Sequence, residues 1–189
     1  MSRDRAALKE WASAVEALLE GRTVVALRKG GIREETKDFR LTSDTFYFFP
    51  TYEHQKEHLL KAPYRGYVAE TKRDWRPDLP TVPIRAWAEA TDELLIEDDE
   101  TLRKLSPFHV WTDEYAEERL RWKRTKPLHC LLLRVYRLDG PWDVEAKAEF
   151  AGCKSWIELP DGGSEIGRKP VLSDEAYRFE VERIRSALA

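Results

Sequence analysis

Cysteine is scarce in this chain, and its spacing matches no metal or redox motif. The 189 residues contain two cysteines, Cys130 and Cys153. Two are too few for the disulfide framework of a small secreted domain, and the C-x-x-C spacing of zinc and redox sites is missing. We therefore expect reduced thiols and a buried, inert Cys153. The alternative is a Cys153 thiolate nucleophile with His109 or His129 as its base.

Long hydrophobic runs are also missing. No apolar run approaches the roughly 20 residues that span a bilayer, and the first residues lead into an amphipathic segment that does not resemble a signal peptide. Hydrophobic residues make up 42% of the chain and charged residues 35%, which is typical of a folded domain with a strongly solvated surface. The sequence predicts a cytoplasmic protein without membrane contact, folded as a single domain over residues 1–189.

A surplus of positive charge is lacking overall but present locally. The formal net charge is −3, which argues against a protein that coats nucleic acid through bulk charge. One stretch, residues 119–138, nevertheless contains no acid. Its bases are Arg119, Arg121, Lys123, Arg124, Lys126, Arg134 and Arg137. Tryptophans lie in or near this stretch, and aromatic rings beside bases are what stacking and phosphate contact require.

The hydrophobic pattern indicates an α+β fold. Residues 4–20 carry apolar side chains at helical spacing, and Ser173 can cap a final helix with a similar stripe. Residues 128–138 are apolar on both faces, which predicts a central strand. We expect one α+β domain with a mixed or antiparallel sheet and helices at both termini.

Shorter elements are expected between these. Strands are predicted at residues 23–27, 46–49, 84–90 and 155–159, with the second ending at Pro50. A hairpin turn is expected after residue 28, and Thr112 can cap a helix over residues 113–123. Residues 63–83, rich in proline, are interpreted as a long surface excursion.

Five short segments carry a resemblance to a known family. They are Lys9-Glu10-Trp11, Arg28-Lys29-Gly30-Gly31-Ile32, Pro50-Thr51-Tyr52-Glu53-His54-Gln55, His109-Val110-Trp111 and Gly152-Cys153-Lys154-Ser155-Trp156. Together they resemble the bacterial family named domain of unknown function 1802, over nearly the whole chain. The resemblance implies no particular activity or catalytic residue. Occasional association of this family with a restriction-endonuclease-type domain implies a protein partner in a restriction or defence system.

Two segments match hydrolase motifs. His54-Gln55-Lys56-Glu57-His58 fits the H-x-x-E-H zinc pattern, in which two histidines on one helical face bind the metal. The alternative is a pair of solvated histidines. Glu145-Ala146-Lys147 has the E-x-K spacing of metal-dependent nucleases, but that spacing also occurs elsewhere in the chain and is expected by chance.

The segment Arg28-Lys29-Gly30-Gly31 follows a predicted strand and has the composition of an anion-binding turn. Glycines expose backbone N–H groups and the bases add charge. The alternative is an ordinary hairpin turn with solvated bases. Arg134 lies within an otherwise apolar strand, so its guanidinium must meet a carboxylate, a ligand phosphate or the solvent edge.

These observations lead to a nucleic-acid- or nucleotide-binding module as the first hypothesis. The alternatives are a metal-dependent hydrolase using His54 and His58 or the E-x-K segment, and a structural partner within a larger complex. The sequence does not identify a cofactor. The expected binding residues are Arg28, Lys29, Gly30, Gly31, His54, Gln55, His109, Trp111, Arg119, Lys126, Arg134, Lys154 and Trp156.

Overall fold

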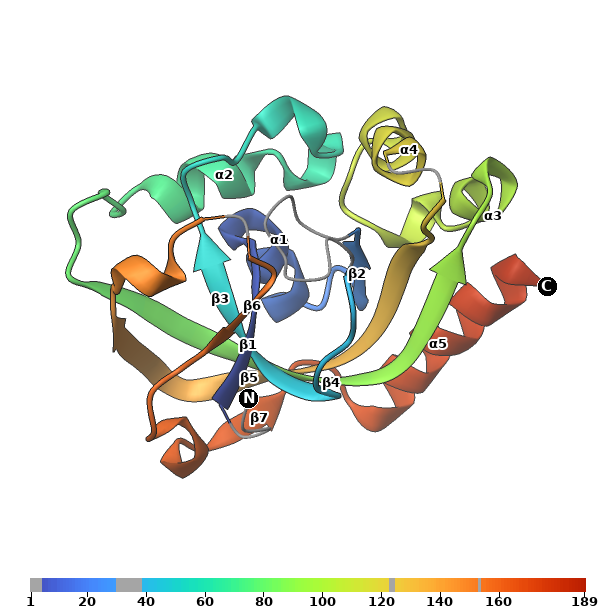
Figure 1. Cartoon of the computed structure of the whole chain (residues 1–189). Coiled ribbons are helices and arrows are strands. Elements are labelled where there is room, and N and C mark those ends of the chain that lie inside the picture. Colours follow the sequence, from blue (N-terminus) through green and yellow to red (C-terminus); the bar gives the residue numbers. More distant parts are fainter. Residues whose placement is uncertain (1–4, 30–38, 123–124, 153) are drawn as a thin grey trace.

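The fold is organised around one mixed, seven-stranded sheet (Figure 1). The computed structural model describes residues 5–29, 39–122, 125–152 and 154–189. The strands are β1 (Ala6–Trp11), β2 (Val25–Arg28), β3 (Thr45–Thr51), β4 (Thr81–Ile96), β5 (Leu128–Glu145), β6 (Trp156–Glu158) and β7 (Arg168–Pro170). The helices are α1 (Ala12–Leu19), α2 (Gly66–Lys72), α3 (Asp99–Lys104), α4 (Asp113–Arg121) and α5 (Asp174–Leu188). The expected α+β class with a mixed sheet is confirmed.

The order of the strands is β2-β5-β4-β3-β1-β6, with β7 paired to β5. Only one described pair, β1 with β3, is parallel; the other described pairs are antiparallel. The long strands β4 and β5 form a curved band, and their pairing shifts register at two places along it. Such irregularities bend and twist a sheet locally. In Figure 1, α1 lies on the inner side of this band and α5 on its outer side.

The central strands are buried on both faces. Phe46 and Phe48 of β3 pack in one hydrophobic cluster with Val15 and Leu18 of α1. Their neighbour Tyr47 faces the other way, into a second cluster. Successive side chains on a strand point to opposite faces, so this alternation means that both sides of β3 are covered. The predicted central strand, now β5, is confirmed and runs seven residues further, to Glu145.

The helix expected over residues 4–20 is present only in its second half. Residues Ala6–Trp11 form β1 instead, paired in parallel with β3 and antiparallel with β6. Pairing on both edges satisfies the backbone of this segment, and Ala6, Ala7 and Leu8 are fully buried there. Tertiary pairing therefore overrides the local helical period. Trp11 adopts extended backbone angles and marks the turn from strand into helix.

The structure confirms the expected helix caps and corrects two other expected segments. The caps are confirmed: the Oγ1 of Thr112 accepts from the N–H of Tyr115, and the Oγ of Ser173 accepts from the N–H of Ala176. β3 does not stop at Pro50 but includes it. Residues 63–83 are not only a surface excursion, because they contain α2, which buries Val68. Among the described residues, no helix is long and apolar enough to cross a membrane.

Candidate functional site

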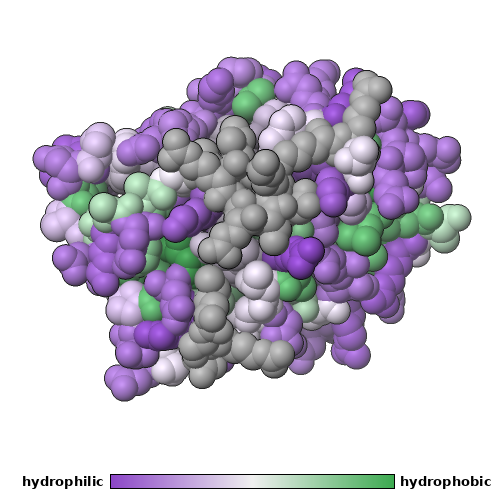
Figure 2. Space-filling view, in the orientation of Figure 1, coloured by the Kyte–Doolittle hydropathy of each residue, from purple (hydrophilic) through white to green (hydrophobic). Residues whose placement is uncertain are grey.

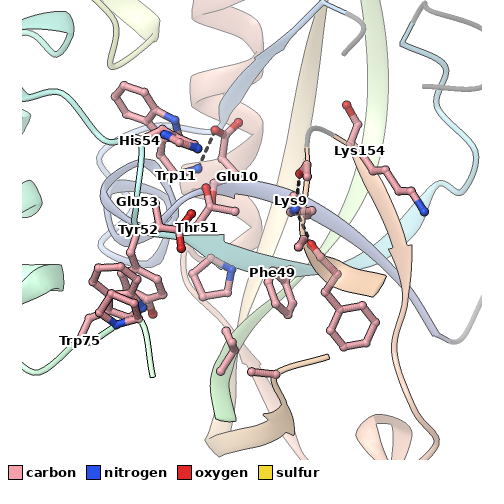
Figure 3. A pocket seen from close by; sticks show the side chains of 18 of the residues that line it. Lys9, Glu10, Trp11, Phe49, Thr51, Tyr52, Glu53, His54, Trp75 and Lys154 are labelled. Atoms are coloured by element: carbon pink, nitrogen blue, oxygen red, sulfur yellow. Dashed lines mark hydrogen bonds between the residues drawn. The ribbon is translucent and has the colours of Figure 1, made fainter. Parts of the chain in front are cut away.

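A large cavity opens where the parallel strands β1 and β3 end (Figure 3). Its volume is about 890 Å³. The floor comes from the last residues of β1, β2 and β3, and the walls come from the segment after α2, from α4 and from residues 146–152 and 154–155. Ligands of open sheets bind at the carboxyl ends of parallel strands, where loops diverge and leave a crevice. On the face in Figure 2, hydrophobic residues gather left of centre within a hydrophilic surround.

The floor holds a buried ion pair between Glu10 and Arg28. The carboxylate of Glu10 is 4% exposed; its Oε1 accepts from the N–H of Trp11 at 2.8 Å, and its Oε2 accepts from Nη1 of Arg28 at 3.2 Å. Arg28 also donates from Nη2 to the Oγ of buried Ser155, at 2.8 Å. Its Nε has no hydrogen-bond partner among the described residues. This donor is buried, so it is enclosed by the protein and not exposed to the cavity.

A second guanidinium, that of Arg119, lies beside this pair. Its central carbon is 5.7 Å from the ring centre of Tyr115 and 5.9 Å from that of Trp111, within cation–π range. The side chain is enclosed by protein and only partly exposed, toward the cavity that it lines. Burial lowers the pKa of Arg119, with a further contribution from Arg28, while Tyr115 and Glu10 oppose the shift. Two guanidiniums thus share the charge of one buried carboxylate.

The cavity lining contains more basic than acidic side chains, although the formal net charge of the whole chain is negative. Seven Lys and Arg residues line it against three Glu residues, in a chain whose formal net charge is −3. Some of these cations stabilise the walls: the ammonium of Lys9 donates to the carbonyls of Phe150 and Gly152, at 2.6 and 2.8 Å (Figure 3). Lys29 donates to the carbonyls of Leu120 and Lys126, both at 2.6 Å, and burial lowers its pKa, with Arg119 adding to the effect.

Two aromatic platforms border the cavity. The inner platform consists of Trp11 and Tyr115, whose rings are nearly parallel at 25° with centres 6.3 Å apart. Trp111, which is buried, packs edge-on against Trp11 at 4.9 Å and fixes its ring. The outer platform consists of Tyr52 and Trp75, stacked at 13° with centres 5.4 Å apart (Figure 3). All four platform rings are half-buried, so each retains surface that a ligand can cover.

Comparison with known proteins assigns the chain to a family. The sequence profile of the family described as Domain of unknown function (DUF1802) matches residues 7–183. The chain belongs to this family. No curated protein matches it significantly.

Two solved structures resemble the DUF1802 fold seen here. One is a mutant of ASCH from Zymomonas mobilis, 13% identical, with a TM-score of 0.48 over 95% of this chain and 96% of that chain. The other is ASCH from Zymomonas mobilis, 13% identical, with a TM-score of 0.46 over 98% of this chain and 96% of that chain.

Four of the five segments that carry the DUF1802 resemblance contribute to the cavity lining. These four include the predicted residues Arg28, Lys29, His54 and Lys154, and Arg119 joins them from α4. Gly30 and Gly31 lie outside the described residues, as does Cys153. The structure therefore brings together much of the predicted basic set, from strands and loops that are far apart in the chain.

Other predicted residues have structural partners away from the cavity. The Oε1 of Gln55 accepts from the N–H of Ser13 at 2.7 Å, which caps the start of α1. The indole of Trp156 stacks on Phe39 and donates to the carbonyl of Arg40. Neither Trp156 nor Lys126 lines the cavity, and His109 and Trp111 are buried in the interior behind it.

Arg134 is the clearest departure from the expected site. It lies beneath α5, where its Nη2 pairs with the carboxylate of Asp174 at 2.6 Å and its Nη1 donates to the carbonyl of Leu172. The expectation that a guanidinium in an apolar strand needs a carboxylate or another partner is met within the protein. Arg134 does not line the cavity.

The H-x-x-E-H segment does not form an α-helix. His54 lies in a loop at the cavity, whereas His58 is exposed within a short 3-10 turn, Glu57–Leu59. Throughout the described residues, no group of three His, Cys, Asp or Glu side chains could hold a metal ion. In the E-x-K segment, Lys147 lines the cavity, while exposed Glu145 does not. Burial raises the pKa of Cys130 to about 12, so this thiol is unreactive.

Sequence reasoning missed several residues that shape the cavity. The helical spacing of residues 4–20 predicts a helix there, and neither Glu10 nor Trp11 is among the expected binding residues. Tyr52 and Trp75 are 23 positions apart, so their stacking leaves no local pattern. The available signal was the family resemblance, because Glu10, Trp11 and Tyr52 all lie within its segments.

Proposed function

We propose that the cavity binds a nucleotide or a segment of single-stranded nucleic acid. The base stacks on the inner platform, and a phosphate lies against the guanidiniums of Arg28 and Arg119. The observation that carries this proposal is that two largely buried guanidiniums and an aromatic platform share one cavity with a single buried carboxylate.

The electrostatic argument favours an anionic ligand. A charge in a water-poor site is costly unless it is paired, and Glu10 can offset only one of the two guanidiniums. A phosphate group carries the missing negative charge, and guanidinium N–H groups match its oxygens in a two-point geometry. Arg119 lines the cavity and can supply such donors.

The aromatic argument distinguishes a nucleotide from a bare anion. Trp11 and Tyr115 present nearly parallel rings beside the guanidiniums, and nucleobases stack on such rings irrespective of their hydrogen-bonding pattern. Inorganic phosphate or a small carboxylate has no planar ring that could stack on these side chains. The metal-dependent hydrolase has no comparable support among the described residues, because no group of three metal ligands is found there.

The test is a binding titration with the four nucleoside 5′-monophosphates and a short single-stranded oligonucleotide, followed by tryptophan fluorescence and calorimetry. We expect binding that weakens as salt rises, since phosphate contacts release counterions. Arg119→Gln removes one guanidinium and should lower affinity about ten-fold or more, the equivalent of one charged hydrogen bond.

The matched control is Arg178→Gln, which removes an exposed arginine of α5 outside the cavity and should leave affinity unchanged. Absence of binding to every nucleotide and oligonucleotide tested would refute the proposal. So would an equal loss of affinity in the two variants.

Two expectations about the cellular setting stay predictions. A protein partner in a restriction or defence system, suggested by the family resemblance, would be found by affinity purification from the native host. A cytoplasmic location would be tested by cell fractionation.

A further inference from the structure

Two aromatic platforms line the same cavity, and their number bears on the size of the ligand. We infer that the cavity recognises two successive nucleotides of a single strand, with one base on the inner platform and the next on the outer platform. This inference rests on the proposed function and deepens it, because it names a dinucleotide unit as the ligand instead of a mononucleotide.

The spacing of the platforms follows from the sheet. Trp11 of β1 is the register partner of Thr51 in β3, and Tyr52 is the next residue after Thr51. Neighbouring strands lie about 4.8 Å apart, so the backbones that carry Trp11 and Tyr52 are separated by little more than one strand spacing. One ring of each platform is therefore carried by neighbouring backbones, and both platforms line the same cavity.

The outer platform is built for a second base and not for a second phosphate. Tyr52 and Trp75 come from different elements, the end of β3 and the segment after α2, yet stack nearly parallel. Arg76, the cation next to Trp75, is strongly exposed and lies 3.9 Å from the carboxylate of Asp78, so solvent screens its charge more than that of Arg119. Glu53 also lines this side. Charge is thus concentrated at the inner platform, and aromatic surface is available at both.

This distribution fits a dinucleoside monophosphate as the smallest complete ligand. Its single phosphate joins the two nucleosides, so one anionic group at Arg28 and Arg119 is flanked by two bases, one for each platform. The volume of about 890 Å³ lies near the upper end of the roughly 300–1,000 Å³ typical of ligand pockets, which leaves room for both nucleosides.

The deciding experiment compares a nucleoside 5′-monophosphate with a dinucleoside monophosphate by calorimetry at constant salt. The dinucleoside monophosphate carries less negative charge, so any gain in its affinity comes from the second nucleoside. We expect it to bind about five-fold to a hundred-fold more tightly, the range for one additional base stack on an aromatic side chain. Trp75→Ala should remove most of this gain.

Phe179→Ala is the matched control, because Phe179 is an exposed aromatic of α5 that does not line the cavity; it should change neither affinity. Tyr52→Leu serves as a second variant of the outer platform, and circular dichroism confirms that each variant is folded. Equal affinities for the two ligands, or a gain that survives in both Trp75→Ala and Tyr52→Leu, would overturn the dinucleotide inference while the proposed function stands. Binding of neither ligand would overturn both.

Discussion

The buried imidazole of His109 makes the stability of this protein depend on pH. The residue is 2% exposed, and neither ring nitrogen has a hydrogen-bond partner among the described residues. The groups that face it are Lys61, whose ammonium donates to the backbone carbonyl of His109, and Asp113, 3.6 Å from that ammonium. Burial, followed by the charge of Lys61, lowers the pKa of His109 from 6.5 to about 4, against opposing effects of Asp113 and the Trp111 backbone.

The sign of the effect follows from the direction of this shift. The unfolded chain takes up the proton near pH 6.5, whereas the folded chain resists it until about pH 4. Between these values the unfolded state binds more protons, so the free energy of unfolding falls as the pH falls. For pKa values of 6.5 and about 4, the loss between pH 7 and pH 5 is about 2 kcal/mol. Asp113, whose pKa is lowered from 3.8 chiefly by its hydrogen bond from Ser106, contributes only at still lower pH.

Urea denaturation followed by tryptophan fluorescence at pH 7, 6 and 5 measures this loss. His109→Leu replaces the titrating ring with an apolar side chain and should reduce the loss over this interval to below about 0.5 kcal/mol, because no proton is then taken up at this position. The reasoning fails if the unmodified protein is as stable at pH 5 as at pH 7. It also fails if the leucine variant loses as much stability as the parent.

Two further predictions concern stability. Gly163→Ala should destabilise the fold by about 1–3 kcal/mol, because the new methyl group would lie 2.7 Å from the Oη of Tyr47 and against the ring of Trp142. Thermal denaturation measures the loss. Gly66→Ala is the control, because a methyl group there meets nothing within 4 Å. Arg134→Ala should destabilise the fold by about 2 kcal/mol, since it removes the charged hydrogen bonds to Asp174 and to the Leu172 carbonyl. The variant should bind nucleotide with unchanged affinity, because Arg134 does not line the cavity. Weaker binding by the folded variant would contradict this placement of Arg134 outside the site.

The sequence by itself determined the elements whose signals are local. The side chains of Thr112 and Ser173 accept hydrogen bonds from backbone N–H groups three residues away. The sequence signal for the start of each helix therefore lies within one helical turn. The apolar run of β5 predicts a strand covered on both faces, whatever covers it. The family resemblance and the α+β class could be predicted for the same reason, because each depends on short segments that can be read in order.

Tertiary structure alone decided where those segments meet. Residues 6–11 have an apparent helical period, but hydrogen bonding to β3 on one edge and β6 on the other makes them a strand, and these partners are about 40 and 150 positions away. The same pairing places Glu10 and Trp11 near Tyr52, and the fold brings Arg28 from β2 and Arg119 from α4 to the same cavity. Arg134, from the same basic stretch as Arg119, pairs instead with Asp174 on the final helix. Charge and aromatic content are properties of composition, whereas their convergence on one surface depends on long-range pairing of the strands, which no local pattern specifies.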